Sequence, residues 1–66
     1  MNKFHERLKE LRKERQIKQS ELAALLSVDQ RTISNWENGL REPDYNMLIK
    51  IASVFEVSTD YLLGLE

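Results

Sequence analysis

The residues from Gln30 to Glu37 include side chains whose polar groups can read the edges of nucleobases. An Asn or Gln amide matches N6 and N7 of adenine, and an Arg guanidinium matches O6 and N7 of guanine. These residue types recur here at helical spacing, with a Ser beside them. The candidate base-contacting residues are therefore Gln30, Arg31, Ser34 and Asn35.

A helix over these residues would present the polar side chains outward. Its only apolar residues, Ile33 and Trp36, centre near one direction, and Arg31 and Asn35 fall roughly opposite. We interpret Trp36 as a core residue rather than as a stacking platform. Such a helix is anchored from behind and has the polar edge that entry into the major groove of DNA requires.

Asp29 and Gly39 mark the predicted ends of this helix. The Asp29 carboxylate can accept from a backbone N–H of the first turn and suits the positive end of the helix, which favours capping over contact with cytosine. Gly39 can adopt the positive φ that ends a helix. The turn that precedes the helix is predicted at Ser27-Val28.

Four more helices are predicted around this one, over Lys3–Arg15, Gln19–Leu26, Tyr45–Phe55 and Thr59–Leu63. Asp44 and Ser58 are suitable N-caps for the last two. Apolar residues at helical spacing line one face of the first three. The expected core residues are Phe4, Leu8, Leu11, Ile17, Leu22, Ala23, Leu26, Leu48, Ile51, Ala52 and Phe55, and Leu25 falls outside. We expect one compact all-α domain of five helices over residues 1–66.

Composition argues against several other classes of function. The chain has no Cys and a single His, so neither a disulfide framework nor a metal site is expected. No catalytic constellation, cofactor motif or small-molecule site is evident, and we do not expect an enzyme. Without a membrane-spanning run or a signal-peptide pattern, the chain is expected to be soluble and cytoplasmic.

The net charge of −1 hides an uneven distribution of charge. Residues 1–41 contain nine Lys and Arg against six Asp and Glu, a net +3, whereas residues 42–66 contain one Lys against five acidic residues, a net −4. Screening limits the reach of charges to about 10 Å, so a DNA backbone responds to the local field. The distribution supports binding with a modest electrostatic contribution.

Four spaced motifs resemble the Xre/Cro-type phage-repressor helix-turn-helix family. They are QSELA at 19–23, ISNWENG at 33–39, Arg41-x-Pro43 and VSTDYLLG at 57–64, and together they cover almost the whole chain. The resemblance implies a sequence-specific double-stranded DNA-binding domain, usually a homodimer on a near-palindromic operator and most often a bacterial or phage repressor. In two places the sequence departs from the family pattern: Lys18 replaces a capping Ser or Thr, and Ser27 replaces a Gly, at a cost of roughly 1 kcal/mol if it is left-handed.

The resemblance also implies roles for individual residues. Gln30, Arg31 and Asn35 match base-reading positions, and Ser34 could touch a base or a phosphate. Expected DNA-backbone contacts are Gln19, Lys18, Thr32, Asn38 and Arg41. Thr32 could instead pack inward, and Asn38 could instead serve the end of its helix.

A buried ion pair and a dimer interface are further implications of the resemblance. Glu37 lies toward the apolar side of its helix, and the expected partner of its charge is Arg12, with Arg15 as second choice. The expected dimer interface consists of Val57, Tyr61, Leu62 and Leu65. The alternative for Val57 and Leu62 is that they close the core of a single chain.

A second class of function remains open at the level of the sequence. The same fold could act as an antitoxin-like or partner-binding helical module in which contact with DNA is secondary.

Overall fold

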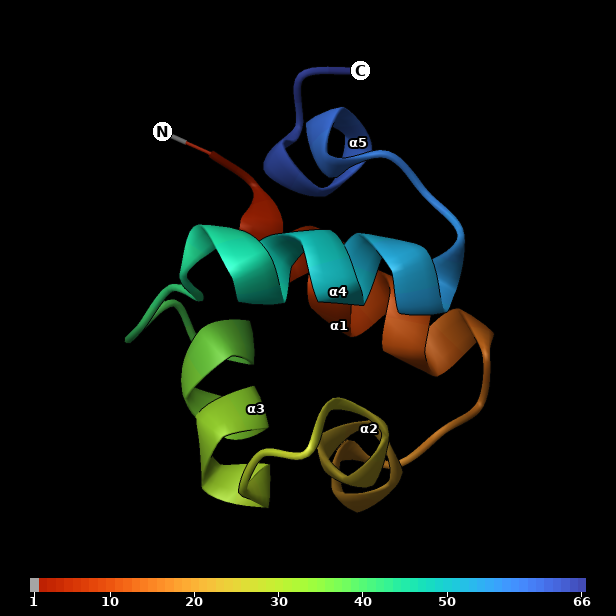
Figure 1. The fold of residues 1–66 in the computed structure, drawn as a ribbon, viewed down its shortest axis with the longest axis vertical. Coiled ribbons are helices and arrows are strands. Elements are labelled where there is room, and N and C mark those ends of the chain that lie inside the picture. The colour runs from red at the N-terminus through yellow and green to blue at the C-terminus, as the bar shows by residue number, and fades with distance from the viewer. Residues whose placement is uncertain (1) are drawn as a thin grey trace.

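The computed structural model describes residues 2–66, which form five helices joined by short loops and contain no strand (Figure 1). The helices are α1 (Phe4–Glu14), α2 (Gln19–Leu26), α3 (Gln30–Glu37), α4 (Tyr45–Phe55) and α5 (Thr59–Leu63). The last four have the predicted bounds. Helix α1 is one residue shorter at each end than predicted, because Lys3 and Arg15 occupy its two caps.

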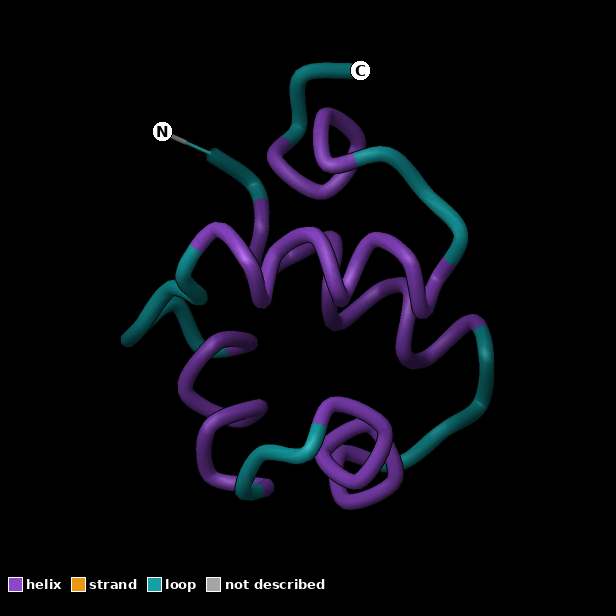
Figure 2. The backbone as a smooth tube through the Cα atoms, in the orientation of Figure 1, coloured by secondary structure: helices purple, strands orange, loops and turns teal. Residues whose placement is uncertain are grey.

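Helices α1 and α4 cross the middle of the molecule, with α4 in front of α1 in Figure 1. Helices α2 and α3 lie together at one end and α5 lies at the other, beside both ends of the described chain (Figure 2). The loop between α2 and α3 is short, so these two helices form a closely joined pair. The pair packs on α1 and α4, which separate it from α5.

The core draws side chains from all five helices. Phe4 of α1 and Trp36 of α3 meet edge to face, with ring centroids 6.3 Å apart and an interplanar angle of 74°. The buried hydrophobic residues are Phe4, Leu8, Leu11, Leu22, Ala23, Leu26, Ile33, Trp36, Ile51, Ala52, Phe55 and Leu62. Ile17 and Leu48 pack against them while partly exposed. The predicted core role of Trp36 is confirmed.

Three of the helices begin at the predicted N-caps. Side-chain oxygens of Asp29, Asp44 and Ser58 accept backbone N–H groups from the first turns of α3, α4 and α5 at 2.7, 2.8 and 2.9 Å. Helix α2 differs, as predicted, because the Lys18 side chain offers no acceptor. The Glu21 carboxylate instead accepts the backbone N–H of Lys18 at 2.7 Å, which is one half of a capping box.

All five helices of the described chain end in the same way, with a left-handed residue and a pair of reversed backbone hydrogen bonds known as the Schellman motif. After α3 and α5 the left-handed residue is Gly39 or Gly64, with φ of 73° and 80°. After α1, α2 and α4 it is Gln16, Ser27 or Glu56, with φ between 56° and 58°. The left-handed conformation expected for Ser27 is confirmed.

Basic side chains bond to helix C-terminal carbonyl groups in the structure. Arg7 donates to the carbonyl of Tyr61 at 3.0 Å, and Lys50 donates to that of Leu26 at 3.2 Å. Arg15 donates to the carbonyl of Phe55 at 2.7 Å. Arg15 therefore serves the end of α4, where a cation also suits the helix dipole.

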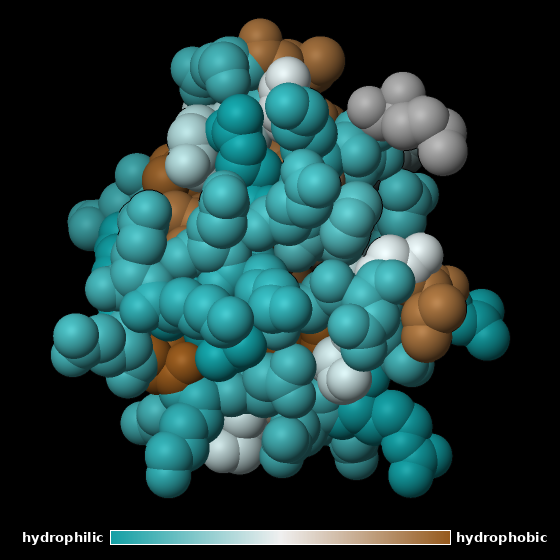
Figure 3. All heavy atoms as spheres, turned by 180° about the vertical axis from the view of Figure 1, so that it is seen from behind, coloured by the Kyte–Doolittle hydropathy of each residue, from teal (hydrophilic) through white to brown (hydrophobic). Residues whose placement is uncertain are grey.

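The side of the molecule behind α4 is covered mainly by hydrophilic side chains, with hydrophobic ones only in separate spots (Figure 3). Helix α1 runs on this side. Its charged run, which includes Glu6, Lys9 and Glu10, is exposed, as expected for a solvated helix face. None of the helices described in the structure is long and apolar enough to cross a membrane.

Candidate nucleic-acid interface

Helix α3 is buried along one side and open along the other. Ile33, Trp36 and Glu37 are 0%, 5% and 5% exposed and face α1 and α2. Of the four candidate base-contacting residues, Gln30 and Arg31 are exposed, and Ser34 and Asn35 are half-buried. The helix is therefore held rigidly from behind while these polar side chains lie on or beside its open edge.

The turn between α2 and α3 fixes how these two helices sit relative to each other. Ser27 takes the left-handed conformation, and the backbone N–H of Val28 donates to the carbonyl of Ala23 at 3.0 Å. Ala23 is 4% exposed, and a bulkier side chain there would overpack the crossing of the helices. The chain then enters α3 directly through the Asp29 cap.

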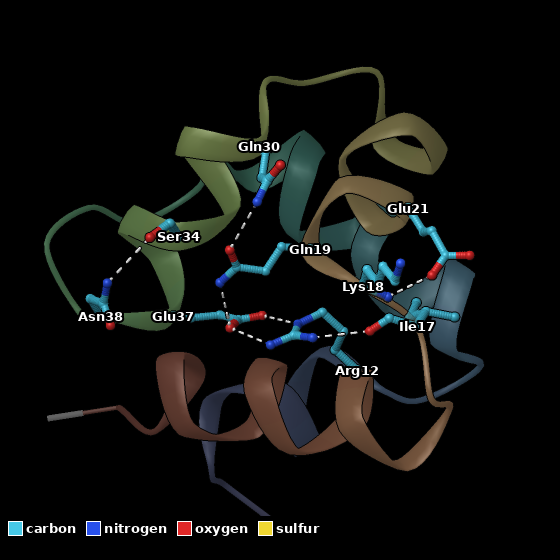
Figure 4. Close-up of polar contacts among 9 residues, drawn as sticks. All are labelled: Arg12, Ile17, Lys18, Gln19, Glu21, Gln30, Ser34, Glu37 and Asn38. Carbon is cyan, nitrogen blue, oxygen red and sulfur yellow. Dashed lines mark hydrogen bonds and ion pairs between the residues drawn. The ribbon is translucent and has the colours of Figure 1, made fainter.

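The residues predicted to contact the DNA backbone differ in their exposure and in their contacts within the protein. Lys18 and Arg41 are exposed, whereas Thr32 is half-buried on the flank of α3. The Asn38 amide donates to the hydroxyl of Ser34 at 3.3 Å, so it also serves the end of α3, the role we left open for it. Figure 4 shows both of these side chains on the same edge of the helix.

The first turn of α2 exposes backbone donors. Since Lys18 cannot cap the helix, no acceptor among residues 2–66 meets the backbone N–H groups of Gln19, Ser20 and Glu21. Unpaired donors at a helix N-terminus bind anions readily, phosphate above all. The departure from the usual capping residue thus leaves donors at the position where a phosphate contact is expected.

The ion pair implied by the resemblance is present, with Glu37 buried and Arg12 half-buried. Arg12 Nε lies 2.6 Å from Glu37 Oε2, and Arg12 Nη2 lies 3.0 Å from Oε1, which is a bidentate arrangement (Figure 4). Arg12 also donates to the carbonyl of Ile17 at 3.0 Å. The pair ties α1 to α3 and is the only ion pair within the described residues.

The pKa of Glu37 lies below its ordinary value. Burial is the largest single influence and would raise it, but hydrogen bonds from Arg12 and Gln19, with the positive charges of Arg12 and Lys9, together outweigh burial. The same hydrogen bond acts in the opposite direction on its donor and raises the pKa of Arg12 above its ordinary value. Both groups therefore carry their charges at neutral pH.

Gln19 occupies a position that the sequence did not reveal. Its amide nitrogen donates to Glu37 Oε1 at 3.1 Å, and its carbonyl accepts from the Gln30 amide at 3.5 Å. We had expected Gln19 to contact phosphate, and only part of its amide remains available for that. No sequence signal would find this link, because it depends on how α2 and α3 cross.

The predicted dimer interface is wrong for Leu62, which is 0% exposed and lies in the core of a single chain. Of the two alternatives given for it, closing its own core is the one observed. Val57 and Tyr61 are half-buried, and Arg7 lies over the Tyr61 ring at 4.3 Å from its centroid. Leu65 is 73% exposed.

Comparisons with known proteins agree with this geometry. Residues 8–62 match the model of a family described as "Helix-turn-helix". The HTH-type transcriptional regulator ImmR of Bacillus subtilis (strain 168) is 43% identical over 58 residues, which is 88% of this chain and 46% of ImmR. The chain thus spans about half the length of the curated relatives it matches.

Two solved structures are similar over nearly the whole chain. A transcriptional regulator from Listeria innocua is 38% identical with a TM-score of 0.92, over 97% of this chain and 60% of that one. The P22 c2 repressor protein, solved in complex with synthetic operator 9T, is 30% identical with a TM-score of 0.90 over the full length of both chains. On its sequence and its fold, this chain belongs to the helix-turn-helix family of transcriptional regulators.

Proposed function

We propose that this chain is the DNA-binding part of a transcriptional repressor and that it places α3 in the major groove of a specific operator. The observation that carries the proposal is the geometry of α3. Its inner side is 0–5% exposed at Ile33, Trp36 and Glu37, while the outer edge carries Gln, Arg, Ser and Asn side chains. The likeness to a repressor that was solved with its operator supports the same role.

Base contacts are assigned to the four residues along this edge. Arg31 can bind O6 and N7 of a guanine, and Gln30 and Asn35 can each bind an adenine. Ser34 lies beside them and can hydrogen-bond to a base or a phosphate. All four belong to the eight residues of α3, so one helix supplies all of the base contacts.

Contacts with the DNA backbone are assigned to the surroundings of α3. The open N-terminus of α2 can bind a phosphate through its N–H groups, with Lys18 and Gln19 beside it. Arg41 follows α3 in the next loop and brings a second exposed cation. Thr32 and Asn38 flank the base-reading edge and complete this set.

The functional unit that we propose is a homodimer acting in the cytoplasm on a near-palindromic operator. Two copies of α3 would then read half-sites about 34 Å apart, one helical turn of DNA. Val57, Tyr61 and Leu65 are the remaining candidates for the interface, since each keeps exposed apolar surface near α5. We expect Leu65→Asp to weaken self-association in analytical ultracentrifugation, and an unchanged dimer would exclude this surface.

Selection of bound sequences from random double-stranded DNA tests the proposed function directly. The proposal predicts enrichment of a short near-palindrome whose binding weakens as salt rises. Enrichment of no sequence, with only salt-sensitive binding, would contradict it. Glu10→Gln, a change on the exposed face of α1, is a suitable control and should select the same sequence.

A partner-binding module is the second candidate function, and one observation favours it. Tyr45 and Ile49 lie one turn apart on α4 and are 85% and 59% exposed. Neighbouring exposed apolar side chains that form a continuous patch mark surfaces that contact other proteins. If this were the main function, added DNA would leave the backbone amide signals of α3 unchanged.

A further inference from the structure

A chain of hydrogen bonds leads from the core of the molecule to the exposed edge of α3 (Figure 4). It begins at Arg12, whose Nε and Nη2 donate to the Glu37 carboxylate at 2.6 and 3.0 Å. Gln19 Nε2 donates to Glu37 Oε1 at 3.1 Å. Gln30 Nε2 then donates to Gln19 Oε1 at 3.5 Å, a long hydrogen bond between two side chains near the surface.

The direction of every bond in this chain is fixed by the chemistry of its inner end. A guanidinium only donates, and an ionised carboxylate only accepts. Glu37 is 5% exposed and bound in bidentate fashion by Arg12, so it is held in the ionised form. Gln19 must therefore turn its NH₂ group toward Glu37 and its carbonyl toward Gln30. Gln30 can meet that carbonyl only with its own NH₂ group.

We propose that Glu37 is a positioning residue that sets the base preference of Gln30, acting through Gln19. This inference rests on the proposed binding of DNA by α3. With one N–H committed to Gln19, the Gln30 amide has its carbonyl oxygen and one N–H left for a base. These match the N6 donor and N7 acceptor of adenine, whereas guanine presents two acceptors and would set its O6 against the Gln30 carbonyl.

Replacing the carboxylate by an amide should reverse the chain. Arg12 Nε makes the shorter of the two bonds, 2.6 Å to Oε2, whereas Oε1 accepts from both Arg12 Nη2 at 3.0 Å and Gln19 at 3.1 Å. In Glu37→Gln we expect the carbonyl of the new amide to keep the Oε2 position beside Arg12 Nε. The NH₂ group then takes the Oε1 position and faces Gln19, and Arg12 Nη2 loses its acceptor. Gln19 then turns its own carbonyl inward and its NH₂ group toward Gln30, which must answer with its carbonyl. The Gln30 NH₂ group is left to face the DNA, and its preference for adenine is lost.

The DNA test compares two operators that differ at one base pair. Selection with the wild-type chain and with Gln30→Ala identifies the base pair that Gln30 reads, because only that position loses its preference in the variant. The wild-type chain is expected to bind the operator with adenine there about 5- to 150-fold more tightly than the one with guanine. Glu37→Gln should bring this ratio close to about one, because its preference for adenine is lost.

Two control variants separate base preference from stability. Glu10→Gln makes the same chemical change on the exposed face of α1 and should keep the wild-type ratio. Ile51→Val reduces a fully buried side chain away from the hydrogen-bond chain, so it should lower the melting temperature without altering the ratio. All ratios are measured below the melting temperature of each variant, with folding checked by circular dichroism.

Side-chain amide NMR tests the direction of the hydrogen bonds without DNA. Nuclear Overhauser effects should place the Gln19 NH₂ group beside Arg12 and Glu37 in the wild-type chain, and beside Gln30 in Glu37→Gln. The Gln30 amide signals should move in that variant and stay in place in Glu10→Gln. Unmoved Gln30 signals in Glu37→Gln would overturn the positioning role.

The outcomes distinguish this inference from the proposed function. A wild-type preference for adenine that Glu37→Gln retains would overturn the role of Glu37 and leave sequence-specific binding intact. Selection of a base other than adenine opposite Gln30 would also contradict the inference. If the wild-type chain selects no sequence, the proposed function itself fails, and the claim about base preference fails with it.

Discussion

Arg31 combines exposure with the longest side chain on the open edge of α3. Only its backbone N–H is occupied, by the Asp29 cap, and the one ion pair among residues 2–66 involves other residues. Its guanidinium is therefore available for a base. Asn35, one turn further on, is half-buried and reaches less far.

We expect Arg31→Ala to weaken binding to the selected operator by about 1–3 kcal/mol and to relax the preference at one base position. A panel of operators with single base changes, measured at constant salt, gives both quantities. Stability should stay within about 0.5 kcal/mol, because the side chain is exposed. Arg41→Ala is the matched comparison, and it should weaken all operators alike. A uniform loss in Arg31→Ala would instead assign that side chain to phosphate.

The Glu37 carboxyl should make part of the stability depend on pH. Its pKa is lower in the folded chain than in the unfolded chain, so its contribution is complete above the ordinary Glu pKa of about 4.3. That contribution should fall as the pH drops through the ordinary pKa and then through the lower folded one. Urea unfolding of the wild-type chain and Glu37→Gln between pH 7 and pH 3 should show their stability difference shrinking as the pH falls. A difference that stays constant would contradict the lowered pKa.

The five helices of the described chain share one way of ending, yet three of them use a residue other than Gly for it. Gln16, Ser27 and Glu56 each adopt φ near +57°, which costs a residue with a Cβ roughly 1–2 kcal/mol. Five Schellman motifs in so short a chain turn the backbone sharply after each helix. This allows short loops, and short loops hold α2 and α3 in a fixed relation.

Glycine at these positions should therefore stabilise the fold. Ser27→Gly and Glu56→Gly are each expected to raise the free energy of unfolding by about 0.5–1 kcal/mol, since relief of the left-handed conformation exceeds the added entropy of the unfolded chain. Thermal unfolding measures the change. Ala24→Gly, inside α2 and exposed, is the control and should lower stability by about 1 kcal/mol. A loss of stability in both of the first two variants would contradict this account of the helix ends.

Local patterns in the sequence predict the elements well because each is set by nearby residues. The Asp29, Asp44 and Ser58 caps act within three positions along the chain, and four of the five helices have the predicted bounds. Spacing also predicts the apolar side of α3. The Arg12–Glu37 pair, by contrast, was implied by family resemblance and not by local pattern.

Contacts that depend on how helices cross could not be predicted in the same way. The amide of Gln19 meets Glu37, 18 positions away, and Arg15 meets the carbonyl of Phe55, 40 positions away. The apolar side chain of Leu62 fits either a dimer interface or the core, and only the packing of α5 on α1 and α4 shows that it is buried. The left-handed conformation of Gln16 and Glu56 cannot be predicted from the sequence, because neither residue type favours it.

At the scale of the whole molecule, some basic side chains of residues 1–41 bind other groups of the fold, and others are exposed at the surface. Arg12 is neutralised by Glu37, and Arg7 and Arg15 donate to carbonyl groups at the ends of α5 and α4. Arg31 is an exposed cation on α3, and Lys18 and Arg41 are exposed just before α2 and in the loop after α3. DNA binding should then depend less steeply on salt than the net charge of residues 1–41 suggests. Hydrogen bonds to bases should supply the remaining binding free energy.

Titration of the selected operator into the ¹⁵N-labelled chain, followed by NMR, tests the central claim most directly. The backbone and side-chain amide signals of Gln30, Arg31 and Asn35 should shift or broaden first, together with the first turn of α2. Signals of α5 and of the exposed face of α1 should change little in comparison. If α3 stays unperturbed while DNA binds, or if the largest changes lie on α1 or on the outer face of α4, then α3 is not the element that reads DNA.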